Sequence, residues 1–285
     1  MKDIKRLFTF GCSFTGYKWA TWANILAYDL DCEFYNFGIS GAGNSYISTT
    51  LAQADAFFNF NEKDLVIVCW TNISREDRWI ENQGWLTPGN IYTQLEYPRE
   101  FVENYANSFH FALRDFTSIH LAANLLENKS TNYKFISMCD IVNHFDQWGS
   151  KEHLEFEHPL AKLGRLYKKS LDKLGKNFYD VLWRGDIGYK FQKDWKTVHP
   201  NYSDGHPTPL EHCEFISRAL GHTFNSSTKS QVKNLHKEWI DFIRKSYTDT
   251  TKGCGIHELD SAVELELLES FMLRNSDESP QQIFH

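Results

Sequence analysis

The segment at residues 64–70, with the sequence DLVIVCW, constrains the fold more than any other part of the chain. After the aspartate it is apolar at every position, without the alternation of a strand that has one face in water. Such a run is typical of a strand buried on both faces, as at the centre of a parallel sheet. The fold must therefore place other strands beside this one and helices over both faces of the sheet.

Strand-like and helix-like segments alternate along much of the chain. We expect further strands at residues 7–11, 32–38 and 134–140, and a short one at 178–183. Apolar residues recur at helical spacing within residues 19–30, 47–58, 101–127 and 160–174. This alternation predicts an α/β fold in which a parallel sheet of about five strands lies between two helical layers. A chain of 285 residues, 41% of them hydrophobic, can bury such a core.

Several local signals refine this pattern. Residues 73–99 and 143–158 lack steady periodicity, and we interpret both as irregular loops. Asn44 is placed to cap the helix at 47–58. Near the end of the alternation, Thr208 is suited to the N-cap of another helix, and Glu211 completes a capping box three residues later.

The character of the sequence changes after residue 225. An amphipathic helix with apolar residues at Val232, Leu235, Trp239 and Phe242 precedes an acidic helix at about 257–273. We therefore divide the chain into an α/β domain at 1–225 and a helical C-terminal arm with a polar tail at 226–285. The apolar faces of the arm need a cover, either the flank of the α/β domain or a second copy. Between these two, we expect a homodimer through the arm.

Charge and cysteine usage limit the partners of the chain. The net charge of −7 argues against nucleic acid or an anionic membrane as a partner. The six cysteines are scattered without a CxxC pair, and the chain shows no secretory signal or bilayer-spanning run, so we expect a cytoplasmic protein. Metal ligands could come from His199, His206, Glu211 and His212, but these lack a recognisable spacing; we expect no metal and no other cofactor.

Polar or small residues follow three of the expected strands. Ser13 follows the first, the glycine-rich loop with Gly41 follows the second, and Asn72 follows the strand at 64–70. Because parallel strands end at a common sheet edge, these residues should lie close together. A later loop adds Asp204 and His206. A hydroxyl nucleophile, a base and hydrogen-bond donors for an oxyanion are the groups that acyl transfer needs.

Four blocks of the chain, over about residues 7–220, resemble those of the SGNH (GDSL-like) hydrolases, which are serine esterases. The blocks are GCSFT at 11–15, NFGISG at 36–41, WTN at 70–72 and DGHP at 204–207. The resemblance implies a flavodoxin-like SGNH fold, a three-layer α/β/α sandwich. It also implies Ser13 as nucleophile and His206 as general base. The oxyanion hole would consist of the backbone N–H groups of Ser13 and Gly41 and the side-chain amide of Asn72.

The chain departs from the family pattern at several positions, one of them Ile73, where the family often has aspartate. Cys12 stands where the family has aspartate, and Trp70 stands where it has glycine. Asp204 lies two residues before His206 rather than three. Asp204 can still orient the imidazole if the chain turns at Gly205; the alternatives are a Ser–His dyad or a more distant carboxylate such as Asp194.

Structural roles compete with these functional ones. Ser13 could cap a helix or fill a turn, Gly41 could be a turn glycine, and Asn72 could cap the end of its strand. Cys12 is an alternative nucleophile, although the residue before the serine should point away from the cleft. We also consider three substrate-binding residues: Arg75 for an acidic group, Trp79 for stacking on a sugar, and Trp70 beside Asn72.

The function that these residues predict is hydrolysis of a small carboxylic ester through an acyl-enzyme, with a small-molecule or carbohydrate ester as substrate. An O-acyl group on a carbohydrate is one such substrate. Two alternatives remain open. One is a catalytically inactive SGNH-fold protein that binds a ligand or has a structural role, and the other is an acyltransferase that uses the same residues.

Overall fold

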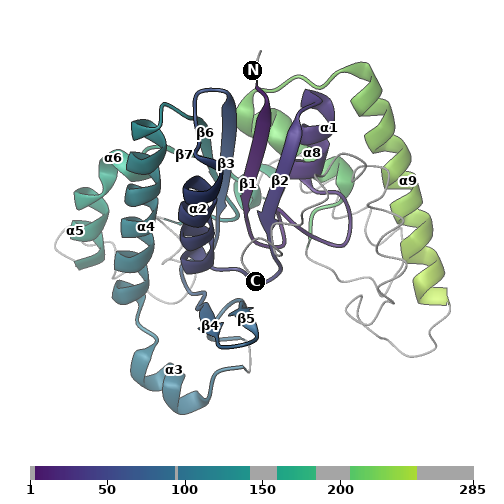
Figure 1. The fold of residues 1–285 in the computed structure, drawn as a ribbon. Helices are drawn as coiled ribbons and strands as arrows, with labels where there is room; N and C mark the ends of the chain where they lie inside the picture. Colours follow the sequence, from purple (N-terminus) through teal and green to yellow (C-terminus); the bar gives the residue numbers. More distant parts are fainter. Residues whose placement is uncertain (1–3, 94–95, 142–158, 184–205, 249–285) are drawn as a thin grey trace.

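The computed structural model describes residues 4–93, 96–141, 159–183 and 206–248. Its centre is a parallel sheet of five strands (Figure 1), in the order β2-β1-β3-β6-β7. The strands are β1 (Arg6–Gly11), β2 (Glu33–Gly38), β3 (Asp64–Trp70), β6 (Asn132–Ser137) and β7 (Leu174–Asn177). If only these five are counted along the chain, the order becomes 2-1-3-4-5, which is that of flavodoxin-like folds. The predicted α/β architecture is confirmed.

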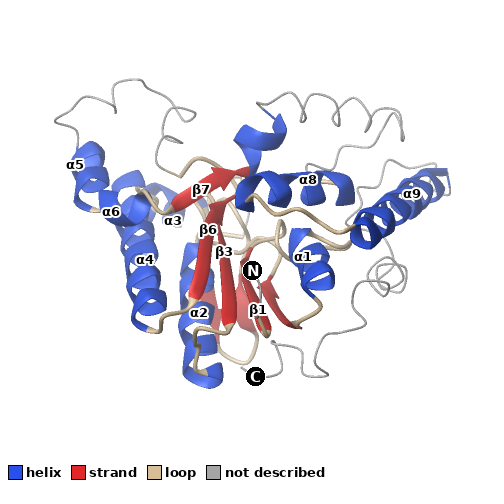
Figure 2. Ribbon diagram, turned by 90° about the horizontal axis from the view of Figure 1, so that it is seen from above, coloured by secondary structure: helices blue, strands red, loops and turns tan. Residues whose placement is uncertain are grey.

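Helices cover both faces of the sheet, as Figure 2 shows from above. One layer contains α1 (Trp22–Leu30), α8 (Pro209–Leu220) and α9 (Ser226–Thr248), which pack against one another. The other layer contains α2 (Asn44–Phe58) and α4 (Ser108–Asn128), with α5 (Pro159–Leu166) and α6 (Lys168–Leu171) against α4. This arrangement leaves the carboxyl ends of the strands uncovered by the two helical layers.

Strand β3 lies in the middle of the sheet and is buried at all of its positions. Its neighbour β1 is held on the other side by two aromatic pairs in register with β2. Phe8 stacks on Tyr35 with 4.9 Å between ring centroids, and Phe10 stacks on Phe37 at 4.8 Å. The loop that follows β1 therefore begins from a rigid strand.

Three predicted elements differ from the structure. The helix expected at 101–127 is two helices, α3 (Arg99–Tyr105) and α4, because the side chain of Asn107 accepts a hydrogen bond from the His110 N–H and starts a new helix. The expected loop at 73–99 contains an antiparallel hairpin of β4 (Arg78–Ile80) and β5 (Gly84–Leu86). The loop expected at 143–158 lies outside the described residues.

The fifth strand was placed wrongly. It is β7 rather than residues 178–183, and the predicted helix at 160–174 is divided into α5 and α6 before it. Residues Tyr179–Trp183 form a single helical turn of the π type. The buried side chains there are Phe178, Val181 and Leu182, whose spacing of three and four residues is helical.

Helix α9 packs on the α/β domain. Its residues Val232, Leu235, Trp239 and Ile243 are buried, and the helix contacts α1 and α8. Of the two covers considered for the apolar face of this helix, the structure shows the flank of the chain's own domain. The acidic helix expected at 257–273 lies outside the described residues, so the homodimer stays a prediction. In the described ranges no helix has both the length and the apolar character needed to cross a bilayer.

Candidate active site

Ser13 lies in a tight turn directly after β1. The N–H groups of Thr15 and Gly16 both donate to the carbonyl oxygen of Cys12, at 2.8 and 3.1 Å. At Gly16 a Cβ atom would lie 2.2 Å from the carbonyl oxygen of Gly38, so a glycine is needed where this turn meets the end of β2. The turn places Ser13 at the carboxyl edge of the sheet, with 5% of its surface exposed.

The cap of α1 is Thr21 rather than Ser13. The Thr21 side chain accepts from the Ala23 N–H and donates to the carbonyl oxygen of Thr15 at 2.6 Å. The helix begins at Trp22, later than the predicted start at residue 19. Ser13 therefore does not cap this helix, and its hydroxyl is available for another role.

His206 lies next to Ser13, although 193 residues separate them in the sequence. The Nε2 atom of His206 is 2.8 Å from the Oγ atom of Ser13. The imidazole stacks on the ring of Tyr17 with 3.8 Å between centroids, and Phe14 meets its edge at 5.6 Å. If His206 carries its proton on Nδ1, Nε2 can accept the Ser13 hydroxyl proton, which is the contact required between a nucleophile and its general base.

The start of α8 holds His206 in place. The predicted capping box is confirmed: the Thr208 N–H donates to the Glu211 carboxylate at 2.7 Å, and the Glu211 N–H donates to the Thr208 hydroxyl at 3.3 Å. The indole N–H of Trp19 donates to the carbonyl oxygen of Pro207 at 2.9 Å. The two residues that follow His206 are thus fixed by hydrogen bonds.

Gly41 and Asn72 lie at the same sheet edge as Ser13. In the sheet, Gly11 aligns with Gly38 of β2, and Phe10 aligns with Val68 of β3, so the loops after the three strands start side by side. These loops lie where the order of the strands reverses, around β1 and β3, which is the usual ligand site of open α/β sheets.

The structural alternatives for Gly41 and Asn72 are both observed. Gly41 has φ +76°, and a Cβ atom there would lie 1.9 Å from the carbonyl oxygen of Thr87, so this position requires glycine. The Oδ1 atom of Asn72 accepts from the Ser74 N–H at 2.7 Å. This bond turns the oxygen of the amide towards the loop and directs its Nδ2 donor to the other side, so a turn role is compatible with an oxyanion role.

The glycine loop is anchored by Asp77, a residue that the sequence analysis did not single out. The Asp77 carboxylate accepts from the N–H groups of Gly43 and Tyr46, at 2.8 and 2.9 Å, and so satisfies the start of α2. Burial raises the pKa of Asp77, and these two hydrogen bonds oppose the rise. The start of α2 is therefore capped by the side chain of Asp77 and not, as predicted, by Asn44.

Asn44 instead connects two loops of the site. Its Oδ1 accepts from the Thr71 N–H at 2.9 Å, and its Nδ2 donates to the Thr71 carbonyl oxygen and to Asp115, at 3.0 and 2.7 Å. Burial raises the pKa of Asp115 to about 6, although the neighbouring Arg114 favours its charged form. This buried network joins the glycine loop to the end of β3, where Asn72 follows.

The other predicted site residues have mixed outcomes. Trp70 is fully buried and packs edge-on against Phe135, with 5.6 Å between centroids, so the prediction that it contacts substrate is wrong. As the last residue of a strand buried on both faces, it belongs to the core. Trp79 is 53% exposed on β4, and Arg75 is part-buried at the sheet edge. Asp204 and Asp194 lie outside the described residues, so the acid that orients His206 stays a prediction.

Cys12 and His212 belong to the core as well. The Cys12 side chain is fully buried, with its Sγ atom 3.9 Å from Sδ of Met138, which does not favour it as the nucleophile. His212 is fully buried and its pKa is lowered to about 3, first by burial and then by the charge of His206. Among the described residues, no group of three or more side chains could hold a metal ion; His199 lies outside them.

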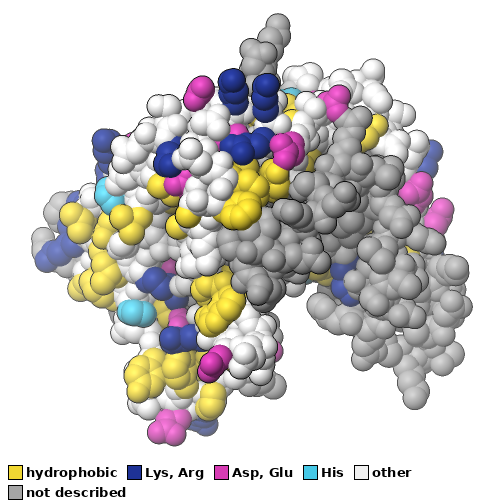
Figure 3. Space-filling view, in the orientation of Figure 1, with side chains coloured by type: hydrophobic (Ala, Val, Ile, Leu, Met, Phe, Trp, Pro, Cys, Tyr) yellow, Lys and Arg dark blue, Asp and Glu magenta, His cyan; other side chains and the backbone are white. Residues whose placement is uncertain are grey.

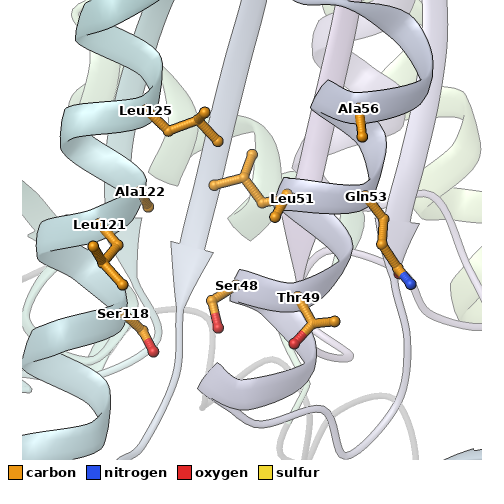
Figure 4. Close-up of a pocket in the computed structure, with 10 residues that line it drawn as sticks. Ser48, Thr49, Leu51, Gln53, Ala56, Ser118, Leu121, Ala122 and Leu125 are labelled. Carbon is orange, nitrogen blue, oxygen red and sulfur yellow. The ribbon is translucent and has the colours of Figure 1, made fainter.

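A hollow on another side of the molecule contains no residue of this site. Hydrophobic side chains gather on the face over α4 (Figure 3), where Phe109, Leu113 and Leu121 are exposed. Beside them, a groove of about 660 Å³ runs between α2 and α4 (Figure 4). Its lining includes Leu51 and Leu125 but neither Ser13 nor His206. The groove is therefore separate from the candidate active site.

No protein-family model matches the chain, and no curated protein matches it. The chain is similar to the solved structure of a lipolytic G-D-S-L family member from Veillonella parvula, with 13% identity over 76% of this chain and 97% of that chain, and a TM-score of 0.40. It is also similar to a GDSL-like lipase from Bacteroides thetaiotaomicron, with 15% identity over 82% of this chain and 90% of that chain, and a TM-score of 0.38. A third similar structure is a catalytic mutant of an acetylxylan esterase from Geobacillus stearothermophilus, with 12% identity over 78% of this chain and 97% of that chain, and a TM-score of 0.41. Two of these proteins are described as GDSL proteins, the family that the four sequence blocks resemble.

Proposed function

We propose that the chain is a serine esterase that hydrolyses a small carboxylic ester through an acyl-enzyme. The observation that supports this most directly is the 2.8 Å contact between Ser13 Oγ and His206 Nε2. It pairs a nucleophile with a base at the sheet edge that also carries Gly41 and Asn72. A hydroxyl, an imidazole and fixed donors in one place form the minimum set for acyl transfer.

In the first half of the reaction, Ser13 Oγ forms a bond to the ester carbonyl carbon while its proton passes to His206 Nε2. The negative charge then lies on the former carbonyl oxygen, where the N–H groups of Ser13 and Gly41 and the Asn72 amide stabilise it. Collapse of this intermediate breaks the ester C–O bond. The imidazolium of His206 gives its proton to the departing alkoxide, and the acyl group stays on Ser13.

In the second half, His206 takes a proton from water, and the resulting hydroxide attacks the acyl carbon. Collapse releases the carboxylic acid and returns the proton to Ser13. The acyltransferase alternative differs only here, since a hydroxyl group of an acceptor replaces water. The exposed Trp79, which meets Trp85 edge-on at 5.8 Å, offers an aromatic surface suited to a carbohydrate portion of the substrate.

Replacement of the nucleophile tests the proposal. We expect Ser13→Ala to lower the kcat/KM for 4-nitrophenyl acetate by a factor on the order of 10³ or more, because the acyl-enzyme cannot form. A fluorophosphonate should label the native chain at Ser13. Ser48→Ala, in α2, is the matched control and should keep full activity.

Two results would contradict the proposal. One is a Ser13→Ala variant with undiminished activity, and the other is fluorophosphonate labelling at a different residue. A folded native chain that hydrolyses no ester and takes no label would favour the binding-protein alternative. Faster release of 4-nitrophenol with glycerol present, together with an acylated glycerol product, would favour the acyltransferase.

A further inference from the structure

A positively charged side chain, Arg75, contacts the glycine loop of the candidate site. Its Nη1 donates to the carbonyl oxygen of Ala42, in the glycine loop, at 2.8 Å. Its Nη2 lies 3.4 Å from the Sδ atom of Met138. The same sulfur lies 3.9 Å from Sγ of Cys12, the residue before Ser13. The guanidinium of Arg75 thus contacts the glycine loop directly, and Met138 connects it to the turn that carries Ser13.

Arg75 has no carboxylate within ion-pair distance in the described part of the chain. Other arginines there do have such partners: Arg6 pairs with Asp64, Arg78 and Arg114 with Glu76, Arg99 with Glu103, and Arg218 with Glu214. The acceptors of Arg75 are a carbonyl oxygen and a thioether, neither of which carries a charge. A part-buried guanidinium with neutral acceptors still favours an anion as its partner.

The groups that interact electrostatically with Arg75 do not supply this anion. Burial raises the pKa values of Tyr179 and Cys139, each to about 12. The charge of Arg75 opposes both rises without cancelling them. The phenol and the thiol are therefore neutral near pH 7, and so is the Cys69 thiol, which also interacts with Arg75 and whose pKa is raised by burial. Asp77 also interacts with Arg75, but its carboxylate accepts its hydrogen bonds from the N–H groups of Gly43 and Tyr46.

We propose that Arg75 binds an anionic group of the substrate, so that the site takes esters that carry a carboxylate or a phosphate near the scissile bond. This inference rests on the proposed esterase function of Ser13 and His206. A guanidinium has about five N–H donors, and the contacts with Ala42 and Met138 engage one on each terminal nitrogen. The remaining donors can form charge-assisted hydrogen bonds to an oxyanion.

A pair of esters that differ in one charge tests the inference. 4-Nitrophenyl hydrogen glutarate has an acyl chain that ends in a carboxylate, and 4-nitrophenyl valerate has a neutral chain of the same length. After subtraction of the uncatalysed rates, we expect the native chain to favour the glutarate ester at least tenfold in kcat/KM. Arg75→Gln should lower this ratio at least tenfold, and Arg75→Lys should lower it less, because a lysine keeps the charge without the planar fork.

The ratio separates recognition of the anion from a general loss of activity. Arg75→Gln also removes the bond to the Ala42 carbonyl, and this loss should slow both esters alike. Arg78→Gln is the matched control, since Arg78 is exposed and pairs with Glu76. It should leave the ratio unchanged. A native chain without preference for the glutarate ester, or a ratio that is the same in Arg75→Gln, would overturn the inference while the esterase proposal stands.

A measurement of binding does not depend on catalysis. Glutarate or inorganic phosphate should raise the Tm of the native chain and should raise that of Arg75→Gln much less, whereas neutral glutaramide should raise neither. The anion with the larger Arg75-dependent shift identifies the preferred group. If the native chain hydrolyses neither ester, the esterase proposal fails, and the Arg75-dependent rise in Tm alone tests the anion site. A rise supports the anion site, and the lack of a rise overturns it.

Discussion

At the scale of single residues, His206 and His212 have opposite environments although they are six positions apart. His206 is part-buried and contacts the Ser13 hydroxyl. His212 is fully buried, and neither of its ring nitrogens has a hydrogen-bond partner in the described structure. A proton on His212 would lie in the core without an acceptor. His206 is therefore the candidate for proton transfer, and His212 acts as a neutral core residue.

This difference predicts how stability depends on pH. The pKa of His212 is lowered from 6.5 to about 3, so the unfolded chain binds a proton below pH 6.5 that the folded chain does not. Stability from this group is therefore lost as the pH falls. Between pH 7.5 and 5 the loss should be about 2 kcal/mol, measured by urea unfolding, and it should be absent in His212→Phe.

The control for this prediction is His110→Phe, because His110 is exposed on α4. It should show the same loss between pH 7.5 and 5 as the native chain. A His212→Phe variant whose stability falls just as steeply as that of the native chain would show that another group causes the decline.

The positions of Ser13 and His206 could be predicted because each lies next to a strong local signal. Ser13 follows an apolar strand, and His206 precedes a capping box. The partners of the supporting residues Asp77 and Asn44 could not be predicted, since they come from other loops and depend on how these loops meet. The error at Trp70 has a related cause, because an aromatic residue at the end of a buried strand can face a cleft or the core.

At the scale of elements, the fully buried strand β3 was easier to predict than the helix boundaries. The bounds of β3 match the apolar run residue by residue, since one uniform pattern marks a strand buried on both faces. The break between α3 and α4 depends on one side-chain bond at Asn107, which the apolar spacing does not reveal. The same spacing hid the division between α5 and α6.

Helix α9 is connected to the candidate base through aromatic side chains. Trp239 of α9 meets Trp19 edge-on, with 5.7 Å between ring centroids. Trp19 donates to the carbonyl oxygen of Pro207, next to His206, at 2.9 Å. Tyr17 contacts both Trp19 and His206. Its ring meets Trp19 edge-on, with 4.6 Å between centroids, and stacks on His206 at 3.8 Å. The helix therefore supports the position of the imidazole from outside the site.

Trp239→Ala tests this support. The loss of a fully buried indole should destabilise the fold by about 3–5 kcal/mol. At a temperature where the variant is still folded, we expect kcat to fall about tenfold with little change in KM, because the imidazole is less well positioned and the substrate contacts remain. The measurement is steady-state hydrolysis of 4-nitrophenyl acetate.

Two further variants make this result interpretable. Trp239→Phe keeps an aromatic ring against Trp19 and should recover most of the kcat. Trp79→Ala removes an exposed tryptophan and should leave the Tm unchanged. If Trp239→Ala loses less stability than expected and keeps its full kcat, α9 has no positioning role.

At the scale of the whole molecule, the strand order determines where the chemistry lies. Connections from β1 and from β3 leave towards opposite faces of the sheet, so the loops after these strands diverge and leave a crevice at their carboxyl ends. The alternation of strands and helices was enough to predict this architecture. It did not predict that α9 would join the helical layer of α1 and α8, because the apolar face of a helix does not identify its cover.

The buried face of α9 changes the prediction for self-association. Since this helix already packs on its own domain, a homodimer would depend on the acidic segment at 257–273, with apolar residues at Leu259, Val263, Leu267 and Phe271. Light scattering on the full chain should then give twice the monomer mass of 33.3 kDa, and a chain that ends at residue 248 should be a monomer. A chain that ends at residue 225 lacks α9 and should unfold at a lower temperature, because the surface of Trp19 becomes exposed. A full chain that is monomeric, or a dimer that persists without the acidic segment, would contradict this route to association.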